Sequence, residues 1–314
     1  MAAGSFAHLP VMPQQLLEYL NPPAAGIFLD GTLGGGGHAR LVLEATGAEA
    51  KLIGLDRDPA ALQAAAAELA NFGGRVQLLH RNFSQAREVA EELGINGFDG
   101  ILFDLGVSSH QLDTRERGFS FRSPGPLDMR MDQTAGLSAA DVLADAEAEE
   151  LTRIFRQYGE ERYAGRIARR IVQNRQDRPL ETTEQLAALV RDAVPGGYVP
   201  ARIHPATRVF QALRIYVNDE LGHVETGVRT AIDLLKPQGR LVVISFHSLE
   251  DRIVKHLFRE ESQNCVCPPR LPVCACGHKA RVALLTRRGQ RADEEEIEHN
   301  PRARSAILRA VRKI

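Results

Sequence analysis

The chain has 314 residues, of which 44% are hydrophobic and 25% are charged, a composition that excludes a mainly disordered protein. Its net charge is −1, so no overall basic excess marks a nucleic-acid binder, and such a partner must be sought in local charge. The four cysteines all lie between residues 265 and 276, and no run of 18 apolar residues occurs, which excludes a secreted disulfide scaffold and a membrane-spanning helix.

The first third of the chain alternates short apolar runs with helical patterns. Strands are expected at 27–30, 51–56, 75–80 and 98–106, and helices at 38–47, 60–70 and about 84–93. Strands and helices at this spacing indicate right-handed crossovers. The sequence therefore predicts an α/β fold with a doubly wound, mostly parallel sheet.

The alternation stops after the fourth strand. Residues 107–136 are rich in Ser, Gly, Pro and Asp, residues 138–194 have a helical period, and a long helix is expected from about 207 to 235. A strand returns at 240–246, and runs at 281–287 and 305–313 predict an antiparallel C-terminal hairpin at the sheet edge. We therefore expect a sheet domain formed by residues 1–110 and 205–314, with an inserted α-helical domain at 111–204.

A glycine-rich loop follows the first strand, where free backbone amides at a helix N-terminus suit a nucleotide-like cofactor. Gly34, Gly36 and Ala39 fit the dinucleotide-binding spacing, and Gly37 completes the loop. Asp56 ends the second strand, where a carboxylate can accept hydrogen bonds from a ribose diol. The alternatives are a tight packing turn for the glycines and a helix-capping or solvated acid for Asp56.

Two further acids favour a sulfonium cofactor over a nicotinamide one. Asp30 precedes the glycines, where a carboxylate repels a pyrophosphate but suits the cationic end of S-adenosylmethionine. Asp104 ends the fourth strand, and its alternative role is to cap a loop. Because reactive groups gather at the carboxyl ends of parallel strands, we expect Asp30, Asp56 and Asp104 in one crevice.

Ten segments in chain order carry a more specific pattern. They are Asp30–His38, Asp56–Pro59, Phe103–Ser109, Arg117–Phe121, Gly125–Asp132, Tyr158–Arg162, His204–Arg208, Phe210–Arg214, Ser245–Arg252 and Asn300–Ser305. Together they resemble the bacterial ribosomal RNA small subunit methyltransferase H family, and they extend over almost the whole chain.

The resemblance implies a class I, Rossmann-like methyltransferase that uses S-adenosylmethionine. The expected product is methylated at the exocyclic N4 of a cytidine, cytidine 1402, in 16S rRNA. The family's cofactor contacts fall here on Gly36, Gly37, His38, Asp56, Phe83, Asp104 and Gln111. Without the resemblance, each of three of these residues also has an ordinary structural interpretation. Phe83 can be a core aromatic, His38 a residue at the start of a helix, and Gln111 an amide in a loop. The expected partner is 16S rRNA within the small ribosomal subunit, and the expected location is the cytoplasm, without membrane attachment.

Asp104, or a carbonyl of residues 105–107, is our candidate for the catalytic hydrogen-bond acceptor. The lone pair of a cytosine N4 is delocalised into the ring, so the enzyme must hold the amine in the geometry that turns this pair toward the methyl donor. Other amino-methylating enzymes carry an Asn- or Asp-Pro-Pro-aromatic tetrad at this strand end, whereas this chain has Asp-Leu-Gly-Val. This departure leaves the stacking partner of the cytosine unassigned.

Two aromatic residues are candidates for base stacking. Phe119 and Phe121 lie in an Arg-rich stretch, where they can present a face to an unstacked base. The alternative is a loop that these rings pin to the protein.

Local charge indicates where RNA binds. Residues 151–214 contain twelve Arg, no Lys and six acids, a balance of +6. Arg162, Arg166, Arg169 and Arg170 recur at helical spacing, so they can share a face that follows phosphates. A solvated helix face is the alternative. We expect the inserted domain to hold the RNA.

The cysteines form two CxC pairs, Cys265 with Cys267 and Cys274 with Cys276. Four thiols this close can bind zinc. The one-residue spacing is tighter than usual and the resemblance supplies no metal role, so free thiols in a proline-rich loop are favoured and no metal is assigned.

Two other functions stay open at this point. One is a nicotinamide-dependent oxidoreductase on the same fold, which cofactor-specific thermal stabilisation would reveal. The other is a non-catalytic ribosome-assembly factor, which would bind RNA without incorporating methyl groups.

Overall fold

The computed structural model describes residues 9–195, 204–268 and 273–314. The chain forms two compact units, which we call the sheet unit (Met1–Gly106 with Leu221–Ile314) and the helical unit (Val107–Glu220). Within the described ranges, every helix is too short or too polar to cross a bilayer.

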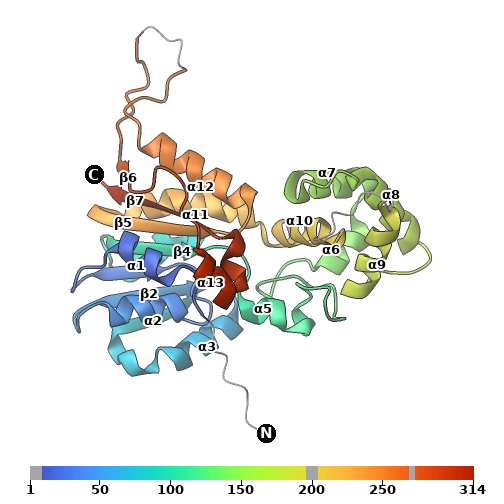
Figure 1. The fold of residues 1–314 in the computed structure, drawn as a ribbon, viewed down its shortest axis with the longest axis horizontal. Helices are drawn as coiled ribbons and strands as arrows, with labels where there is room; N and C mark the ends of the chain where they lie inside the picture. The colour runs from blue at the N-terminus through green and yellow to red at the C-terminus, as the bar shows by residue number, and fades with distance from the viewer. Residues whose placement is uncertain (1–8, 196–203, 269–272) are drawn as a thin grey trace. The chain divides into compact units, whose positions relative to one another are not determined.

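The sheet unit contains a seven-stranded sheet in the order β3-β2-β1-β4-β5-β7-β6 (Figure 1). Its strands are β1 (Ile27–Asp30), β2 (Lys51–Asp56), β3 (Val76–His80), β4 (Phe98–Asp104), β5 (Leu235–Ser245), β6 (Val282–Leu284) and β7 (Ile307–Lys313). The first five strands in this order pair in parallel, and β7 pairs antiparallel with both β5 and β6. The predicted mostly parallel sheet with a C-terminal antiparallel hairpin is confirmed.

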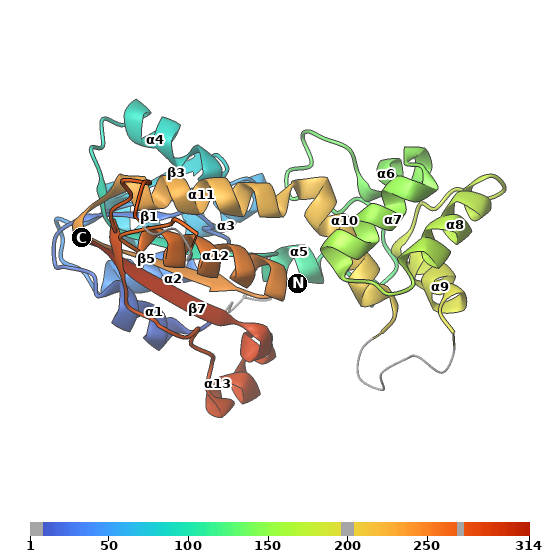
Figure 2. The same cartoon turned by 90° about the horizontal axis from the view of Figure 1, so that it is seen from above.

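Helices cover both faces of this sheet because its strands are apolar on both sides. Phe28 and Leu29 are neighbours on β1, and they enter opposite cores, as the two-residue period of a strand requires. Figure 2 shows α4 and α11 on one side of the strands and α1 on the other. The core that contains Phe28 is covered by α1 (Pro13–Leu20), α2 (Gly37–Glu44) and α3 (Pro59–Glu68). The core that contains Leu29 is covered by α4 (Ala86–Glu92), α11 (Glu220–Leu234) and α12 (Ser248–Glu261).

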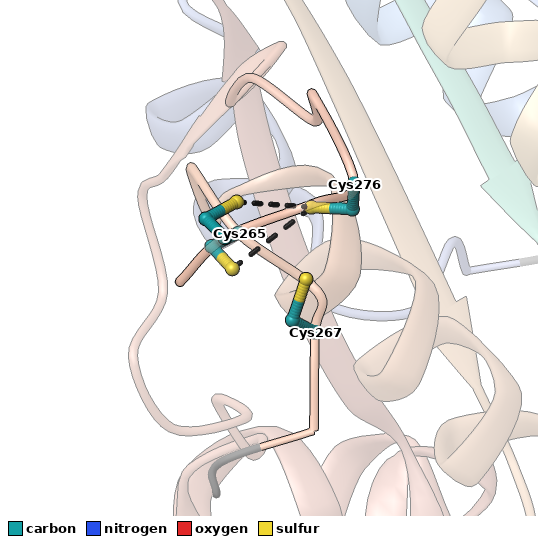
Figure 3. A group of neighbouring side chains, drawn as sticks. Cys265, Cys267 and Cys276 are labelled. Atoms are coloured by element: carbon teal, nitrogen blue, oxygen red, sulfur yellow. Dashed lines mark hydrogen bonds between the residues drawn. The ribbon is translucent and has the colours of Figure 1, made fainter. Parts of the chain in front are cut away.

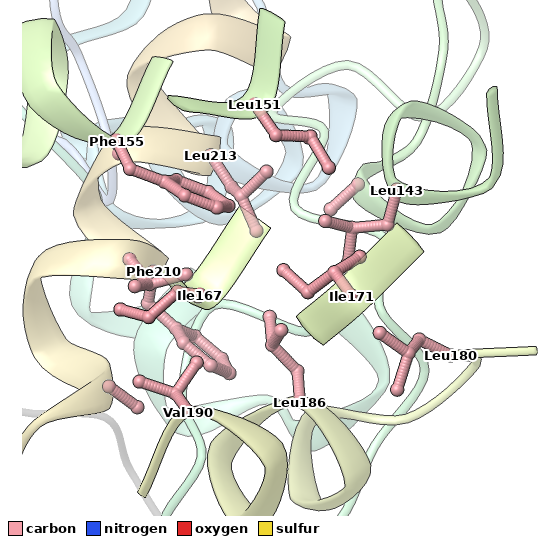
Figure 4. Close-up of a cluster of buried hydrophobic side chains, with 14 of the residues drawn as sticks. Leu143, Leu151, Phe155, Ile167, Ile171, Leu180, Leu186, Val190, Phe210 and Leu213 are labelled. Carbon is pink, nitrogen blue, oxygen red and sulfur yellow. The ribbon is translucent and has the colours of Figure 1, made fainter. Parts of the chain in front are cut away.

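The helical unit packs around a core of its own (Figure 4). Leu151 and Phe155, and likewise Ile167 and Ile171, lie four residues apart and are fully buried, so each pair projects from one helix face. The predicted helical period between 138 and 194 is confirmed. The helices are α5 (Ser109–Asp113), α6 (Ala139–Asp145), α7 (Ala148–Gly159), α8 (Ala164–Arg175), α9 (Thr183–Ala193) and α10 (Ala206–Asn218).

The boundary between the units differs from the one predicted. The helix expected from about 207 to 235 is two helices, α10 and α11, separated at Asp219, whose φ of 45° is left-handed. α10 packs in the helical core, where Gly159 of α7 allows a close approach, because a Cβ there would lie 2.4 Å from the carbonyl oxygen of Arg208. The helical unit therefore extends from Val107 to Glu220 rather than from 111 to 204.

Two details of the C-terminal part also differ from expectation. β5 begins at Leu235, five residues earlier than predicted, and contains an irregular stretch in which the register with β4 shifts between Phe98 and Gly100. The link between the last two strands, where the sequence analysis placed no helix, contains a short helix, α13 (Glu294–His299), whose first turn is capped by the side chain of Asp293.

Candidate active site

Three acids end neighbouring parallel strands of the sheet unit. Asp30 is the last residue of β1, Asp56 of β2 and Asp104 of β4, and β1 lies between the other two strands. The chain passes from β1 outward to β3 and then returns to place β4 on the other side of β1, so the strand order reverses between β1 and β4. Open parallel sheets bind ligands at the carboxyl ends of the strands at such a point. The predicted grouping of these acids is present.

Asp30 is fully buried at the centre of this group. Its Oδ1 accepts a hydrogen bond from the backbone N–H of Thr32 at 3.1 Å, whereas Oδ2 has no hydrogen-bond partner among the residues described. Burial raises the pKa of Asp30 to about 8, and the nearby carboxyls of Asp104 and Asp56 act in the same direction. A buried oxygen without a partner is costly, so Asp30 suits a ligand that brings a cation or a hydrogen-bond donor.

Asp56 is held by the backbone of the loops beside it. Its Oδ2 accepts from the N–H of Gly34 and its Oδ1 from the N–H of Asp58, both at 2.8 Å. Burial raises the pKa of Asp56 to about 6, and these two hydrogen bonds oppose that rise. The carboxyl group is therefore fixed in orientation, and the remaining lone pairs of its oxygens are available to accept from a ligand.

The glycine loop joins Asp56 to the start of α2. Gly34 and Gly36 have left-handed φ values of 52° and 84°, which a residue with a side chain adopts only with strain. Gly36 also packs closely, because a Cβ there would lie 3.3 Å from Ala65 and from Leu69. Gly37 is the first residue of α2, where helix geometry leaves the initial N–H groups without intrahelical partners. The loop is therefore a packing turn, and the cofactor contact expected at its amides stays a prediction.

Asp104 faces the buried ring of His38. The Nε2 of His38 lies 2.8 Å from the carbonyl oxygen of Val11, which can only accept, so Nε2 carries the proton of the neutral ring. Burial lowers the pKa of His38, which favours that neutral ring. Its Nδ1 lone pair therefore faces Oδ2 of Asp104 at 3.5 Å, an arrangement that favours a protonated carboxyl over a carboxylate.

The pKa of Asp104 is also shifted in the direction that favours the protonated carboxyl. Burial raises the pKa of Asp104 to about 8, and the charge of Glu250 adds to the rise. The Oδ1 of Asp104 makes no hydrogen bond to any described part of the chain. A carboxyl with a pKa near neutrality and one unsatisfied oxygen is suited to accept a proton.

Sequence reasoning missed two residues that shape Asp104. Thr32 accepts a hydrogen bond on its hydroxyl from the backbone N–H of Asp104, which ties the end of β1 to the end of β4. Glu250 is almost fully buried at the start of α12, where its carboxylate accepts from the N–H groups of Phe246 and His247. The signal for Glu250 was available, since an acid three residues into a helix that follows a strand is typical of a capping box.

Phe83 is half-buried and packs against Phe103 of β4, with ring centroids 4.9 Å apart. Two glycines make room for this ring pair. A Cβ on Gly31 would lie 2.3 Å from the ring of Phe103 and 2.8 Å from Cβ of Phe83, and a Cβ on Gly227 would lie 2.3 Å from the ring of Phe83. The sequence analysis singled out neither glycine, because only the folded structure shows that an aromatic ring fills the space beside each Cα.

Gln111 belongs to the helical unit, where it has a structural role. Its side chain accepts from the N–H of Ser108 at 3.0 Å, and its own N–H donates to the hydroxyl of Ser108 at 3.2 Å. This reciprocal pair caps α5. The cofactor contact expected at Gln111 from the family resemblance stays a prediction.

The structure corrects the expected role of Phe119, whereas that of Phe121 stays a prediction. Phe119 is buried in the core of the helical unit, so its ring offers no open face to a base. Phe121 is half-buried, and its ring lies 4.7 Å from that of His204 and 4.9 Å from that of Phe210. The ring of Phe119 packs the loop against the helical unit, which is the alternative that the sequence left open.

The arginines predicted to share a helix face are exposed. Arg166 and Arg170 lie on the solvent side of α8, whereas Ile167 and Ile171, one position further along, are fully buried. Arg162 is also exposed, just before the helix, where its guanidinium lies 5.9 Å from the ring centre of Tyr163. The face is therefore basic and accessible, as expected, and its role in RNA binding stays a prediction.

The chain is similar to proteins of one family over almost its whole length. Residues 5–314 match the MraW methylase family. A protein of Syntrophotalea carbinolica named "Ribosomal RNA small subunit methyltransferase H" is 63% identical over 314 residues, which cover 100% of both chains. Proteins of the same name from Trichlorobacter lovleyi and Geobacter sulfurreducens are 57% and 56% identical, and the matches cover 98% and 99% of this chain and 99% and 100% of those proteins.

Proposed function

We propose, because this chain belongs to the MraW methylase family, that it is an S-adenosylmethionine-dependent methyltransferase of small-subunit ribosomal RNA. The observation that carries the proposal is the 63% identity, over all 314 residues, to a relative named for that activity. The reaction is transfer of a methyl group to the exocyclic N4 of a cytidine in 16S rRNA. The finer assignment to cytidine 1402 rests on the family resemblance and is part of the same proposal.

The residues at the strand ends fit the cofactor. The unsatisfied Oδ2 of Asp30 is suited to its cationic end, and Asp56 to the ribose hydroxyls. Phe83 offers an aromatic wall for the adenine, and the first amides of α2, from Gly37, would be available to polar groups of the ligand. When bound, S-adenosylmethionine supplies an electrophilic methyl carbon, so the chain itself has to bind, orient and take up a proton.

Asp104 is the residue that we assign to the target amine. Its Oδ1 lacks a partner in the described structure and is free to accept a hydrogen bond from the N4 amine, which fixes the direction of the nitrogen lone pair. The amine loses a proton on methylation, and Asp104, whose pKa is about 8, accepts it in its ionised form, which becomes the main form only above about pH 8. His38 holds this carboxyl from the other side through Nδ1, and so acts as a positioning residue.

We assign RNA binding to the exposed arginines of the helical unit. Arg162, Arg166 and Arg170 are accessible on one side of a segment with a local charge of +6, and guanidinium groups pair well with phosphates. The small ribosomal subunit in the cytoplasm is the proposed setting, since its RNA is the substrate. The double variant R166E/R170E should weaken RNA binding and lower the slope of log K against log salt by about 1.4 or more.

A matched control separates a specific role of the α8 arginines in RNA binding from a general effect of lost positive charge. R287E/R288E changes two exposed arginines of the sheet unit and should leave the RNA affinity and its salt slope near those of the wild type. Unchanged affinity in R166E/R170E would remove the basic face of α8 from the proposal without touching the methyl-transfer reaction.

Mass spectrometry tests the function most directly. Small-subunit RNA from cells that lack this modification is incubated with the protein and isotopically labelled S-adenosylmethionine, then digested to nucleosides and to mapped fragments. The expected result is labelled N4-methylcytidine in one fragment, the one that contains cytidine 1402. Binding of the subunit without label in RNA would indicate a non-catalytic assembly factor, and thermal stabilisation by a nicotinamide cofactor alone would indicate the oxidoreductase.

A further inference from the structure

The segment between α12 and β6 carries a feature that methyl transfer does not use. Figure 1 shows this part of the chain leaving the sheet unit as a narrow extension. Its described residues include all four cysteines, Cys265 and Cys267 on the outgoing arm and Cys274 and Cys276 on the returning arm. The two CxC pairs therefore meet from opposite arms of one excursion of the chain.

Hydrogen bonds close the base of this extension, near the end of α12. The ring Nε2 of His278 lies 3.1 Å from the carbonyl oxygen of Glu260, and the N–H of Arg281 donates to the carbonyl of Glu261 at 2.8 Å. Beyond this base the apolar side chains that the structure describes are exposed, since Val266 is 42% exposed and Val273 is 76% exposed. Hydrophobic packing therefore does not hold the two arms together.

The four sulfur atoms lie close enough together to bind one metal ion. The four Sγ atoms all lie within 4.8 Å of one another. The Sγ of Cys276 lies 3.6 Å from that of Cys274 and 3.9 Å from that of Cys265 (Figure 3). Zinc–sulfur bonds of about 2.3 Å in a regular tetrahedron separate the sulfurs by about 3.8 Å. The observed separations match that edge, and they are well above the about 2.05 Å of a disulfide bond.

Free thiols do not account for this convergence. A neutral thiol is a weak hydrogen-bond donor and a weak acceptor, so four of them on an extension without an apolar core contribute little to its closure. The one-residue spacing within each pair, which disfavoured zinc in the sequence, is compatible with a site in which each arm supplies one edge of the tetrahedron.

We propose that Cys265, Cys267, Cys274 and Cys276 bind one Zn²⁺ ion as a structural site that joins the two arms of this extension. All four ligands come from the chain, which leaves no open position for a water or a substrate, so the ion has no part in methyl transfer. The thiols lose their protons on binding, and the resulting thiolates are the ligands.

Elemental analysis of the full chain, purified under reducing conditions without chelators or metal-affinity resin, tests the proposal. We expect about one zinc ion per chain in the wild type. The double variant C265S/C276S, which removes one thiol from each pair, should lose zinc by about tenfold or more, whereas V273S, a change at an exposed non-ligand position of the same segment, should retain it. The C265S/C276S chain should also be cut faster by protease between α12 and β6, while its affinity for S-adenosylmethionine stays unchanged.

Replacement of the metal by Co²⁺ in the wild-type chain provides a readout that does not depend on any variant folding. Four thiolates around Co²⁺ should give strong thiolate charge-transfer absorption and the visible bands of a tetrahedral centre. A wild-type chain with no zinc and four reactive thiols would overturn the proposal. So would two disulfides, iron with inorganic sulfide, or a Co²⁺ spectrum without thiolate ligation.

Discussion

The ionisation of Asp30 can be tested by replacing it with Asn, which has nearly the same shape but no charge. Asp30 is fully buried, and burial raises its pKa from 3.8 to about 8. The folded pKa lies above the unfolded one, so the protonated carboxyl contributes stability that is fully present below about pH 4 and is lost as the pH rises to about 8. Without ligand, Asp30→Asn should therefore stabilise the protein, and increasingly so at alkaline pH.

The size of the effect follows from the shift. At 1.36 kcal/mol per pKa unit, a shift of about 4 units corresponds to an upper bound of about 6 kcal/mol when the carboxyl is ionised in both states. Between pH 5 and pH 9 the difference in unfolding free energy between variant and wild type should grow by as much as about 4 kcal/mol. This is a large fraction of the 5–15 kcal/mol that stabilises an ordinary domain.

Urea denaturation at several pH values measures this difference. The exposed Asp145→Asn is the matched control, and its difference from the wild type should stay near zero throughout. Calorimetric titration with S-adenosylmethionine should show the opposite trend for Asp30→Asn, a loss of affinity, because the variant no longer offers a carboxylate to the cation. A difference in unfolding free energy that stays constant from pH 5 to pH 9 would refute the argument that burial controls this group.

Two further predictions concern the same site. Gly31→Ala places a Cβ 2.3 Å from the ring of Phe103, so it should lower the free energy of unfolding by about 1–3 kcal/mol and weaken cofactor binding. Urea denaturation and calorimetry measure these two effects, and both should be absent in the control Gly35→Ala, whose Cβ meets no described atom within 4 Å. The single-turnover rate of methyl transfer should rise with pH through about 8 as Asp104 ionises. Asp104→Asn should lower this rate by about 10²–10⁴-fold and flatten its pH profile. An Asp104→Asn variant that keeps the wild-type pH profile would exclude Asp104 as the proton acceptor.

The strand-end acids were predictable because they depend on short-range patterns. An apolar run followed by an acid and a glycine loop defines the end of β1, and the parallel pairing of β1, β2 and β4 brings the three carboxyls to one edge. The sequence did not predict which of them carry unsatisfied oxygens. That property of Asp30 and Asp104 depends on burial and on neighbours from distant segments, such as Glu250.

The helical unit was less predictable in its limits than in its helices. The helical spacing of apolar residues on both sides of Asp219 predicts a continuous helix. Only the left-handed backbone conformation of Asp219 separates α10 from α11. Phe119 was taken as an RNA contact from its basic surroundings, although its ring is buried. Sequence neighbours report local charge, whereas the side of the loop on which a ring lies is decided by tertiary packing.

The cysteines show a limit of a different kind. Their spacing along the chain disfavours a metal, and their spacing in space favours one, because the arms that carry Cys265 and Cys276 run back toward each other. No local pattern predicts how two arms converge.

The order of the strands also has a consequence for the synthesis of the chain. β4 pairs on one side with β1, which is translated early, and on the other with β5, whose last residue comes 141 residues after β4 ends (245 − 104). At about 5–20 residues per second, roughly 7–28 seconds pass before the second partner leaves the ribosome. The helical unit is compact by itself and can fold during that interval. A nascent chain that stalls before residue 235 therefore exposes an apolar strand edge, which is a template for aggregation.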